Sequence, residues 1–226
     1  MRYWLVMPAA GIGRRFGSER PKQYAPLRGR TVIQWALAPF LADERCAGAL
    51  VALAAHDPYW PEVAPPGVMT VAGGAERSHS VRNALAALAP RAAAEDWVLV
   101  HDAARPCLAP EDLERLLGEL AEHPLGGLLA VPAADTLKRA DAQHCVAATV
   151  DRTGLWRALT PQMFRYGALC RALDAAHAAG RVPTDEAQAL EWLGERPALI
   201  SASAANLKIT SAADLTVAAA LLEGLG

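Results

Sequence analysis

The sequence predicts an α/β fold in which helices flank a mostly parallel sheet. The first observation is that short apolar runs alternate with amphipathic segments, which is typical of consecutive strand and helix units. The second is a glycine-rich loop directly after the first apolar run, where a strand of such a sheet commonly meets a ligand. The third is a single polar excursion that interrupts the alternation late in the chain. The expected strands are residues 3–7, 49–54, 68–71, 97–101 and 128–131.

The first strand enters a loop of small residues, residues 8–16, that contains two glycines. Bare backbone N–H groups in such a loop can approach a phosphate chain, and Arg15 and Lys22 supply positive charge beside it. The loop lacks the Gly-Lys-Ser/Thr triplet of a Walker A motif. It also lacks the third glycine of a dinucleotide fingerprint, because Phe16 stands at that position. The pattern therefore favours a nucleoside triphosphate site outside both of these classes.

The later elements have recognisable start signals. Pro110 suits the first turn of a helix and precedes leucines at helical spacing, and Ser211 with Asp214 has the spacing of a capping box. The proline-rich residues 58–67 are interpreted as a loop. Residues 132–156 contain two short runs separated by a polar turn, which predicts a β-hairpin outside the layered core. We expect this arm to bind a second subunit.

Length and composition narrow the class of protein. With 226 residues and 23.9 kDa we expect one domain, residues 1–226, that includes the arm. The net charge of −2 gives no basic field for long nucleic acid. The first apolar run is too short for a signal peptide and no apolar stretch of about 18 residues follows, so we expect a cytoplasmic protein without a membrane partner. The four cysteines and six histidines lack metal-ligand spacing, so no metal site made by protein ligands is predicted.

Chemically active side chains gather after the apolar runs. Lys22 follows the first run, Ser80 the third and Asp102 the fourth. Because the carboxyl ends of parallel strands meet at one edge of the sheet, we expect these residues to share a site. Further polar segments occur later in the chain, at residues 135–136, 151–152, 160–162, 184–187 and 206–210.

Five segments carry a resemblance to a known family: residues 8–15 with 21–23, 100–106, 150–152, 159–162 and 206–210. Together and in this order they resemble the 2-C-methyl-D-erythritol 4-phosphate cytidylyltransferases of the non-mevalonate isoprenoid pathway. The resemblance covers nearly the whole chain. It implies a Rossmann-like nucleotidyltransferase domain and a homodimer made through the β-hairpin arm. It also implies CTP as co-substrate, with Mg²⁺ or another divalent cation held mainly by the CTP triphosphate.

The same resemblance implies a reaction in which the methylerythritol phosphate attacks the α-phosphorus of CTP and pyrophosphate leaves. The attacking phosphate oxygen is already mostly ionised near neutral pH, so no general base is needed and cations must bring two anions together. Arg15 and Lys22 resemble the transition-state stabilisers of the family. Arg152 and Lys208 resemble the pair that positions the acceptor phosphate, and we expect Arg152 to act across the dimer interface.

Further residues are assigned to the two substrates by the resemblance. Asp102 also has the chemistry of a magnesium ligand or of a turn cap, and both interpretations stay open. Ala75 stands where relatives often carry a polar residue. The resemblance implies that the base is recognised largely through backbone groups there, so this departure removes a side-chain contact and leaves the assignment of the base unchanged. Asp185 fits the first turn of a helix capped by Thr184 and is left out of the site. The substrate-binding set is Asp102, Arg105, Thr136 and Thr160, and the nucleotide-binding set is Ala9, Ala10, Gly11, Gly74 and Ser80.

Three other functions are compared with this one. A cytidylyltransferase for ribitol 5-phosphate would share the glycine loop and the chemistry, and would differ near Thr136 and residues 105–107. A non-catalytic nucleotide-binding regulator would have no reason to keep four phosphate-binding cations together. An NAD-dependent oxidoreductase is disfavoured by the missing third glycine.

Overall fold

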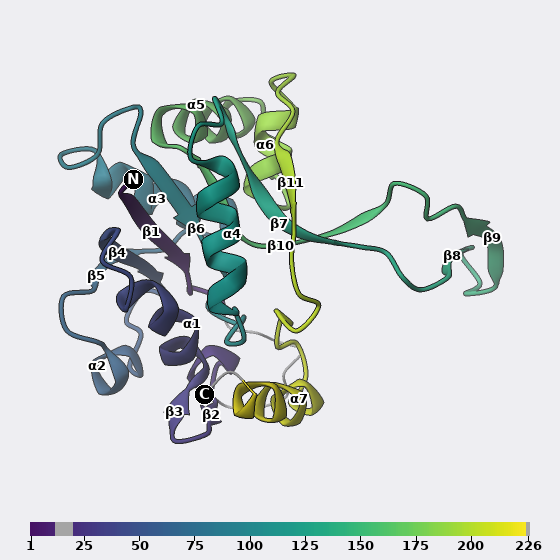
Figure 1. The fold of residues 1–226 in the computed structure, drawn as a ribbon, viewed down its shortest axis with the longest axis horizontal. Coiled ribbons are helices and arrows are strands. Elements are labelled where there is room, and N and C mark those ends of the chain that lie inside the picture. The colour runs from purple at the N-terminus through teal and green to yellow at the C-terminus, as the bar shows by residue number, and fades with distance from the viewer. Residues whose placement is uncertain (12–19, 225–226) are drawn as a thin grey trace.

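The computed structural model describes residues 1–11 and 20–224. Its centre is a seven-stranded sheet in the order β11-β7-β10-β6-β1-β4-β5, with helices packed on both faces (Figure 1). β10 is antiparallel to both of its neighbours, and the other neighbouring pairs are parallel. The predicted α/β class with a mostly parallel sheet is confirmed. The strands are β1 (Tyr3–Pro8), β4 (Cys46–Leu53), β5 (Met69–Ala72), β6 (Trp97–Val100), β7 (Gly126–Pro132), β10 (Trp156–Arg165) and β11 (Ala198–Ser201).

Five of these strands match the predicted apolar runs, but β10 and β11 are absent from the prediction. β10 carries Pro161 and the polar Gln162 within its apolar run, and its pairing with β7 shifts register between Ala158 and Gln162. Proline cannot donate to a strand ladder, so the sequence signal of β10 is weak. The antiparallel strand therefore depends on its two neighbours, not on a local pattern.

The two faces of the sheet are packed by different helices. In β1, Leu5 and Met7 belong to the core beneath α1 and α4, whereas Val6 belongs to the core beneath α3, α5 and α6. This alternation follows from the two-residue period of a strand. The helices are α1 (Val32–Leu41), α3 (Arg77–Leu88), α4 (Pro110–Leu120), α5 (Tyr166–Ala178) and α6 (Glu186–Glu191).

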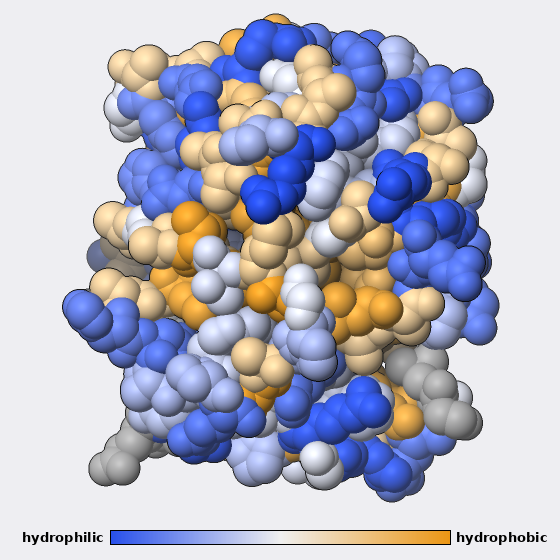
Figure 2. Space-filling view, turned by 90° about the vertical axis from the view of Figure 1, so that its left-hand side faces the viewer, coloured by the Kyte–Doolittle hydropathy of each residue, from blue (hydrophilic) through white to orange (hydrophobic). Residues whose placement is uncertain are grey.

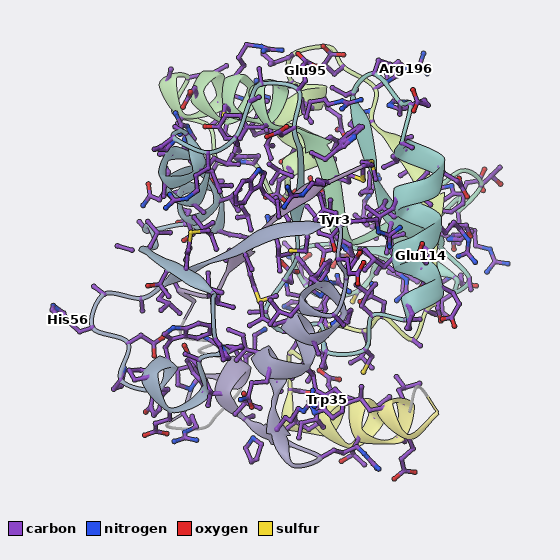
Figure 3. All side chains as sticks on the ribbon, turned by 60° about the vertical axis from the view of Figure 1, so that its left-hand side comes forward. Tyr3, Trp35, His56, Glu95, Glu114 and Arg196 are labelled. Atoms are coloured by element: carbon purple, nitrogen blue, oxygen red, sulfur yellow. The ribbon has the colours of Figure 1, made fainter. Side chains whose placement is uncertain are left out.

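The C-terminal helix covers a third, smaller core. α7 (Ala212–Glu223) begins after Ser211, which forms the predicted capping box with Asp214, and α4 begins at Pro110 as predicted. Leu222 of α7 is buried, and Trp35 of α1 packs against the same cluster (Figure 3). The short elements that join this cluster to the sheet are the 3-10 helix η2 (Lys22–Tyr24) and the strands β2 (Pro26–Leu27) and β3 (Arg30–Thr31).

Two local predictions are wrong. The N-cap of α6 is Asp185, whose side chain accepts a hydrogen bond from the Gln188 backbone N–H at 2.9 Å, and not Thr184. An extended backbone at Asp185 allows this cap, which aspartate favours. The predicted loop at residues 58–67 contains the short helix α2 (Trp60–Val63), whose first turn begins with a Trp-Pro pair.

The predicted β-hairpin is present as a two-stranded antiparallel ladder separate from the main sheet. It consists of β8 (Leu137–Ala140) and β9 (Val146–Val150) and projects far from the body on two extended segments (Figure 1). Val146 is 66% exposed, and Leu155 and Trp156 at the root of the arm are also exposed. The arm therefore presents apolar side chains that its own chain does not cover.

The surface on the side away from the arm carries both apolar and hydrophilic residues (Figure 2). Figure 2 shows a band of apolar residues across the middle of that face, with hydrophilic residues above and below it. The four cysteines are free, and Cys107 is buried. Within residues 1–11 and 20–224, every helix is too short or too polar to cross a membrane.

Candidate active site

A cavity of about 300 Å³ opens at the carboxyl ends of β1, β5 and β6. This is the edge of the sheet at which the sequence predicts a shared site. The described residues that line it come from the glycine loop, η2, the loop into α3, the segment after β6 and the segment before α7. They are Pro8, Ala9, Ala10, Gly11, Lys22, Gln23, Gly74, Ala75, Glu76, Arg77, Ser80, Asp102, Ala103, Ala104 and Lys208.

The start of the glycine loop is held by Gln23. Its buried amide nitrogen donates to the carbonyl oxygens of Ala9 at 2.8 Å and Gly11 at 3.1 Å. The Ala9 backbone N–H also continues the strand pairing by donating to the carbonyl of Ala52 at 2.8 Å. These bonds fix the path of the backbone at the cavity rim, which a backbone-lined phosphate site requires.

The opposite wall is the loop between β5 and α3. The Gly74 backbone N–H donates to the Ser80 hydroxyl at 3.0 Å, and that hydroxyl donates to the Glu76 carbonyl at 3.2 Å. A Cβ atom on Gly73 would lie 2.4 Å from the Cβ of Ala10, so the two walls touch there. Ser80 shapes the loop with its hydroxyl, and Gly73 allows the walls to approach.

Asp102 forms the charged floor of the cavity. Arg77 Nε lies 3.0 Å from its Oδ1, and Lys208 Nζ and Arg105 Nε lie 2.9 and 3.5 Å from its Oδ2. Burial by itself would raise the pKa of the Asp102 carboxyl. The charges of Arg77, Lys208 and Arg105 outweigh burial and hold that pKa well below its usual range. Asp102 is therefore an ionised carboxylate near neutral pH.

Arg77 links this floor to α6. While its Nε faces Asp102, its two terminal nitrogens form a bidentate pair with Glu186 at 2.6 and 3.0 Å. The side chain of Glu186 is 1% exposed. Burial raises the pKa of Glu186, and the Arg77 charge acts against that rise. Neither Arg77 nor Glu186 is among the site residues predicted from the sequence.

A fully buried histidine supports the turn that carries Asp102. His101 Nε2 lies 3.0 Å from the Arg105 carbonyl, which can only accept, so Nε2 carries the proton. His101 Nδ1 then accepts from the Thr160 hydroxyl at 3.0 Å, and the same oxygen accepts the Asp102 backbone N–H at 3.1 Å. Burial lowers the pKa of His101 to about 4, so the ring is neutral near pH 7. Thr160 thus uses its hydroxyl within the protein, below the cavity.

Arg105 is likewise buried below the floor. One terminal nitrogen donates to the Asn206 carbonyl at 2.7 Å, and the Asn206 amide donates to the Thr160 carbonyl at 2.7 Å. Arg105 therefore ties the turn after β6 to the segment that carries Lys208. Its side chain reaches Asp102 from beneath and is absent from the cavity lining among the described residues.

The two lysines meet at the cavity from different parts of the chain. Lys22 Nζ donates to the backbone carbonyl of Ile209 at 2.8 Å, next to Lys208 in the sequence. The Lys208 side chain is 40% exposed while it contacts Asp102. Two ammonium groups that line one cavity suit the binding of phosphate groups.

Thr136 and Arg152 lie on the arm and not at the cavity of their own chain. Leu137 pairs with Val150, so Thr136 and Arg152 flank the same end of the hairpin. Both are exposed. Arg15 lies outside the described residues. The structure thus brings eight of the predicted residues to one cavity: Ala9, Ala10, Gly11, Lys22, Gly74, Ser80, Asp102 and Lys208.

A family model described as 2-C-methyl-D-erythritol 4-phosphate cytidylyltransferase matches residues 3–224. The chain belongs to this family. Relatives of the same description from Ectopseudomonas mendocina and Halorhodospira halophila are each 56% identical, over 95% and 98% of this chain and 93% and 94% of their own lengths. A crystal structure of the Francisella tularensis member matches with a TM-score of 0.86 at 34% identity, covering 98% of this chain and all of the other.

As a member of the 2-C-methyl-D-erythritol 4-phosphate cytidylyltransferase family, the chain is an enzyme of the non-mevalonate isoprenoid pathway. It transfers a cytidylyl group from CTP to 2-C-methyl-D-erythritol 4-phosphate and releases pyrophosphate. The predicted family, fold and activity are confirmed. Sequence reasoning missed Arg77, Glu186 and His101. Two of them, His101 and Glu186, lie in segments that it named, residues 100–106 and 184–187.

Proposed function

We propose that CTP and methylerythritol phosphate meet in the cavity at the carboxyl end of the sheet, one substrate on each side of the Asp102 floor. The nucleotide lies between the two facing loops, beside Ala9, Ala10, Gly11, Gly74 and Ser80. The close approach of Gly73 to Ala10 supports this assignment, because a flat base fits a slot lined by backbone and small side chains. The hydrogen-bonded Ser80 hydroxyl supports recognition of the base by backbone groups.

The phosphate of the acceptor lies at Lys208. Its ammonium group is partly exposed and is held at 2.9 Å from the Asp102 carboxylate. Arg152 of the partner subunit supplies the second cation, and the partner's Thr136 supplies a hydroxyl beside it. The location of both residues at one end of the hairpin supports this, since a single approach of the arm brings them together.

Catalysis rests on charge and not on proton transfer. Lys22 and Arg15 stabilise the negative charge that grows as pyrophosphate leaves, while Lys208 and the partner's Arg152 hold the attacking phosphate against its repulsion from CTP. The contact of Lys22 with the Ile209 carbonyl supports this division, because Ile209 is adjacent to Lys208 and one cation of each set is thus held at the same segment. Asp102 and Arg105 fix Lys208 from below.

Mg²⁺ fits this cavity as a companion of the triphosphate. Among the described residues, no group of three or more His, Cys, Asp or Glu side chains could hold a metal ion. The acidic residues in the cavity lining are Asp102 and Glu76, and Asp102 is already in contact with three cationic side chains. A cavity with few protein oxygens suits an Mg²⁺ ion that takes most of its oxygen ligands from the triphosphate, with Asp102 nearby. When bound, the ion would neutralise triphosphate charge.

The exposed apolar residues of the arm support a homodimer. Leu137 and Trp156 line a recess of about 220 Å³ at the root of the arm, on residues that the rest of the chain leaves uncovered. An exposed apolar surface rimmed by polar residues is typical of an interface. With two-fold symmetry, each arm reaches the cavity of the other subunit, and each site contains residues of both chains.

The observation that carries this proposal is the set of cations around Asp102, in the same cavity as the start of the glycine loop. The test is CTP-dependent pyrophosphate release with methylerythritol phosphate and, in parallel, with ribitol 5-phosphate. We expect turnover with the first substrate and a large preference for it. Lys208→Ala should raise KM for the acceptor, while replacement of the exposed Arg91 by alanine serves as a control. Equal activity of Lys208→Ala and wild type would contradict the assignment of the acceptor side.

A further inference from the structure

Glu186 is a charged residue that the reaction described so far does not use. Its side chain is 1% exposed and is absent from the cavity lining among the described residues. Burying a carboxylate is costly unless it is paired, and Glu186 is paired with both terminal nitrogens of Arg77. A hydrophobic residue would fill this position at lower cost, so the charge calls for an explanation.

The pair continues into the active site. The third nitrogen of the same guanidinium, Nε, donates to Oδ1 of Asp102 at 3.0 Å, and Oδ2 of Asp102 lies 2.9 Å from Lys208 Nζ. A series of alternating charges thus runs from the buried end of α6 to the ammonium group at the cavity. Because the arginine fork is planar, fixing two of its nitrogens on one carboxylate fixes the direction of the third.

We propose that Glu186 is a positioning residue for the reaction, acting through Arg77 to hold Asp102 and thereby Lys208 in place. The inference rests on the proposed role of Lys208 at the acceptor phosphate. Glu186 anchors the guanidinium from behind, so that Arg77 presents one N–H to Asp102 and leaves Oδ2 for Lys208. Without that anchor, Arg77 would have Asp102 as its remaining anionic partner among the ion pairs of the described residues.

Loss of the Glu186 charge should then act on Asp102. The fork of Arg77 can turn to bind both carboxylate oxygens of Asp102, which is the preferred bidentate geometry. Lys208 would lose its contact at Oδ2, and its flexible side chain would no longer be held at the acceptor side. The expected defect is in the placement of the acceptor, while the two walls of the nucleotide pocket keep their own hydrogen bonds.

α6 does not need the Glu186 charge to stay in place. Asp185 caps the helix through the Gln188 N–H at 2.9 Å. Gln162 of β10 donates to Asp185 at 2.9 Å and accepts the Ala187 backbone N–H at 2.9 Å. These contacts anchor the first turn of α6 to the sheet independently, so the charge of Glu186 can be removed with the helix retained.

The experiment is Glu186→Gln in the full-length enzyme, with CTP and methylerythritol phosphate each varied. We expect kcat/KM for the acceptor to fall by about 10- to 100-fold, the scale of a small misplacement of a reacting group, with little change in KM for CTP. The matched control is Asp43→Asn at the opposite, amino end of the sheet. Asp43 is also a mostly buried carboxylate in a bidentate pair, with Arg45 at 2.8 and 3.0 Å. Asp43→Asn should lower the thermal midpoint and leave kcat/KM unchanged.

A second measurement tests the route through Asp102. In an Asp102→Asn background, Glu186→Gln should cause little further loss, since the residue on which it acts has changed. A full additional loss in the double variant would overturn the proposal. So would wild-type kcat/KM in Glu186→Gln, or a fall explained by the unfolded fraction alone.

If Glu186→Gln does not fold, Arg77→Lys decides the question. Lysine keeps the charge but cannot bind both carboxylates through one fixed fork, so the same selective loss for the acceptor is expected. Normal kinetics in Arg77→Lys would then overturn the proposal. Lys208→Ala with normal acceptor kinetics would instead contradict the proposed function, whatever Glu186 does.

Discussion

Lys22 is a residue that we propose to act on the charge that develops during the reaction. Its ammonium group lines the cavity and donates to the Ile209 carbonyl at 2.8 Å, beside Lys208. We expect Lys22→Ala to lower kcat far more than it raises KM for CTP, because the charge it meets grows as pyrophosphate leaves. The loss should be roughly 100- to 1,000-fold, or about 2.7 to 4 kcal/mol, by analogy with oxyanion donors. Steady-state kinetics measure it, and near-normal kcat would remove Lys22 from the mechanism. Arg15→Ala is expected to behave in the same way.

His101 makes folding stability depend on pH. Its pKa is about 4 in the folded protein because the ring is buried, compared with 6.5 for an ordinary histidine. Between these values the unfolded chain binds a proton that the folded chain does not, so the unfolding free energy rises with pH by up to about 1.4 kcal/mol per pH unit. This stability is present above pH 6.5 and is lost as the pH falls toward 4. Urea unfolding at several pH values should show a flatter profile for His101→Gln than for wild type. Identical slopes would contradict the assignment.

Individual residues also mark the limit of prediction from sequence. Lys22, Asp102 and Lys208 stand beside recognisable motifs, and the structure brings them to one cavity. Arg77 and Glu186 are 109 positions apart in the sequence, and no local sequence pattern predicts that their side chains form an ion pair. Their charges meet only because α3 and α6 pack into the core on the same face of the sheet. Thr160 stays a predicted substrate ligand, and its buried hydroxyl gives it a supporting role as well.

At the scale of elements, prediction succeeds where a local pattern decides the structure. The capping box at Ser211 and the proline at position 110 start their helices as expected. The long antiparallel strand β10 has no such pattern, because its place is set by pairing with β6 and β7. The hairpin of β8 and β9 is predictable since its two runs and polar turn are adjacent in sequence.

The close approach of the two loops that form the proposed nucleotide pocket can be tested by one substitution. A Cβ at Gly73 would lie 2.4 Å from the Cβ of Ala10 and 3.1 Å from the Leu53 carbonyl. We expect Gly73→Ala to destabilise the protein by about 1–3 kcal/mol through overpacking. It should also raise KM for CTP by roughly tenfold, the equivalent of about 1.4 kcal/mol, as the loops separate. Urea unfolding and initial rates provide the two measurements.

The matched control is Gly118→Ala on α4, where a new Cβ meets no atom within 4 Å. In that helix interior the substitution should stabilise the protein by about 0.5–1 kcal/mol and leave KM for CTP unchanged. If Gly73→Ala proves as harmless as Gly118→Ala, the two walls do not form the nucleotide slot.

At the scale of the whole molecule, the predicted site residues fall into two separate groups. One group lines the cavity, and the other, Thr136 and Arg152, lies on an arm that projects from the body (Figure 1). If a second copy of the chain supplies the arm, Thr136 and Arg152 can reach the cavity without any rearrangement of the packed sheet. The sequence indicates the arm and its residues, but one chain alone does not bring them to the cavity.

Subunit mixing tests this division directly. We combine equal amounts of a Lys22→Ala protein and an Arg152→Ala protein and allow the subunits to exchange. If Arg152 serves the partner's cavity, each mixed dimer has one doubly damaged site and one site in which both residues are intact. About half of the dimers are mixed at equilibrium, so about a quarter of all sites should be wild-type-like, a count that follows from two-fold symmetry. Two nearly inactive proteins would therefore give an active mixture. Exchange is verified by mass spectrometry with an isotope-labelled subunit. With exchange complete, activity no higher than the average of the two parents would mean that Arg152 acts in its own chain.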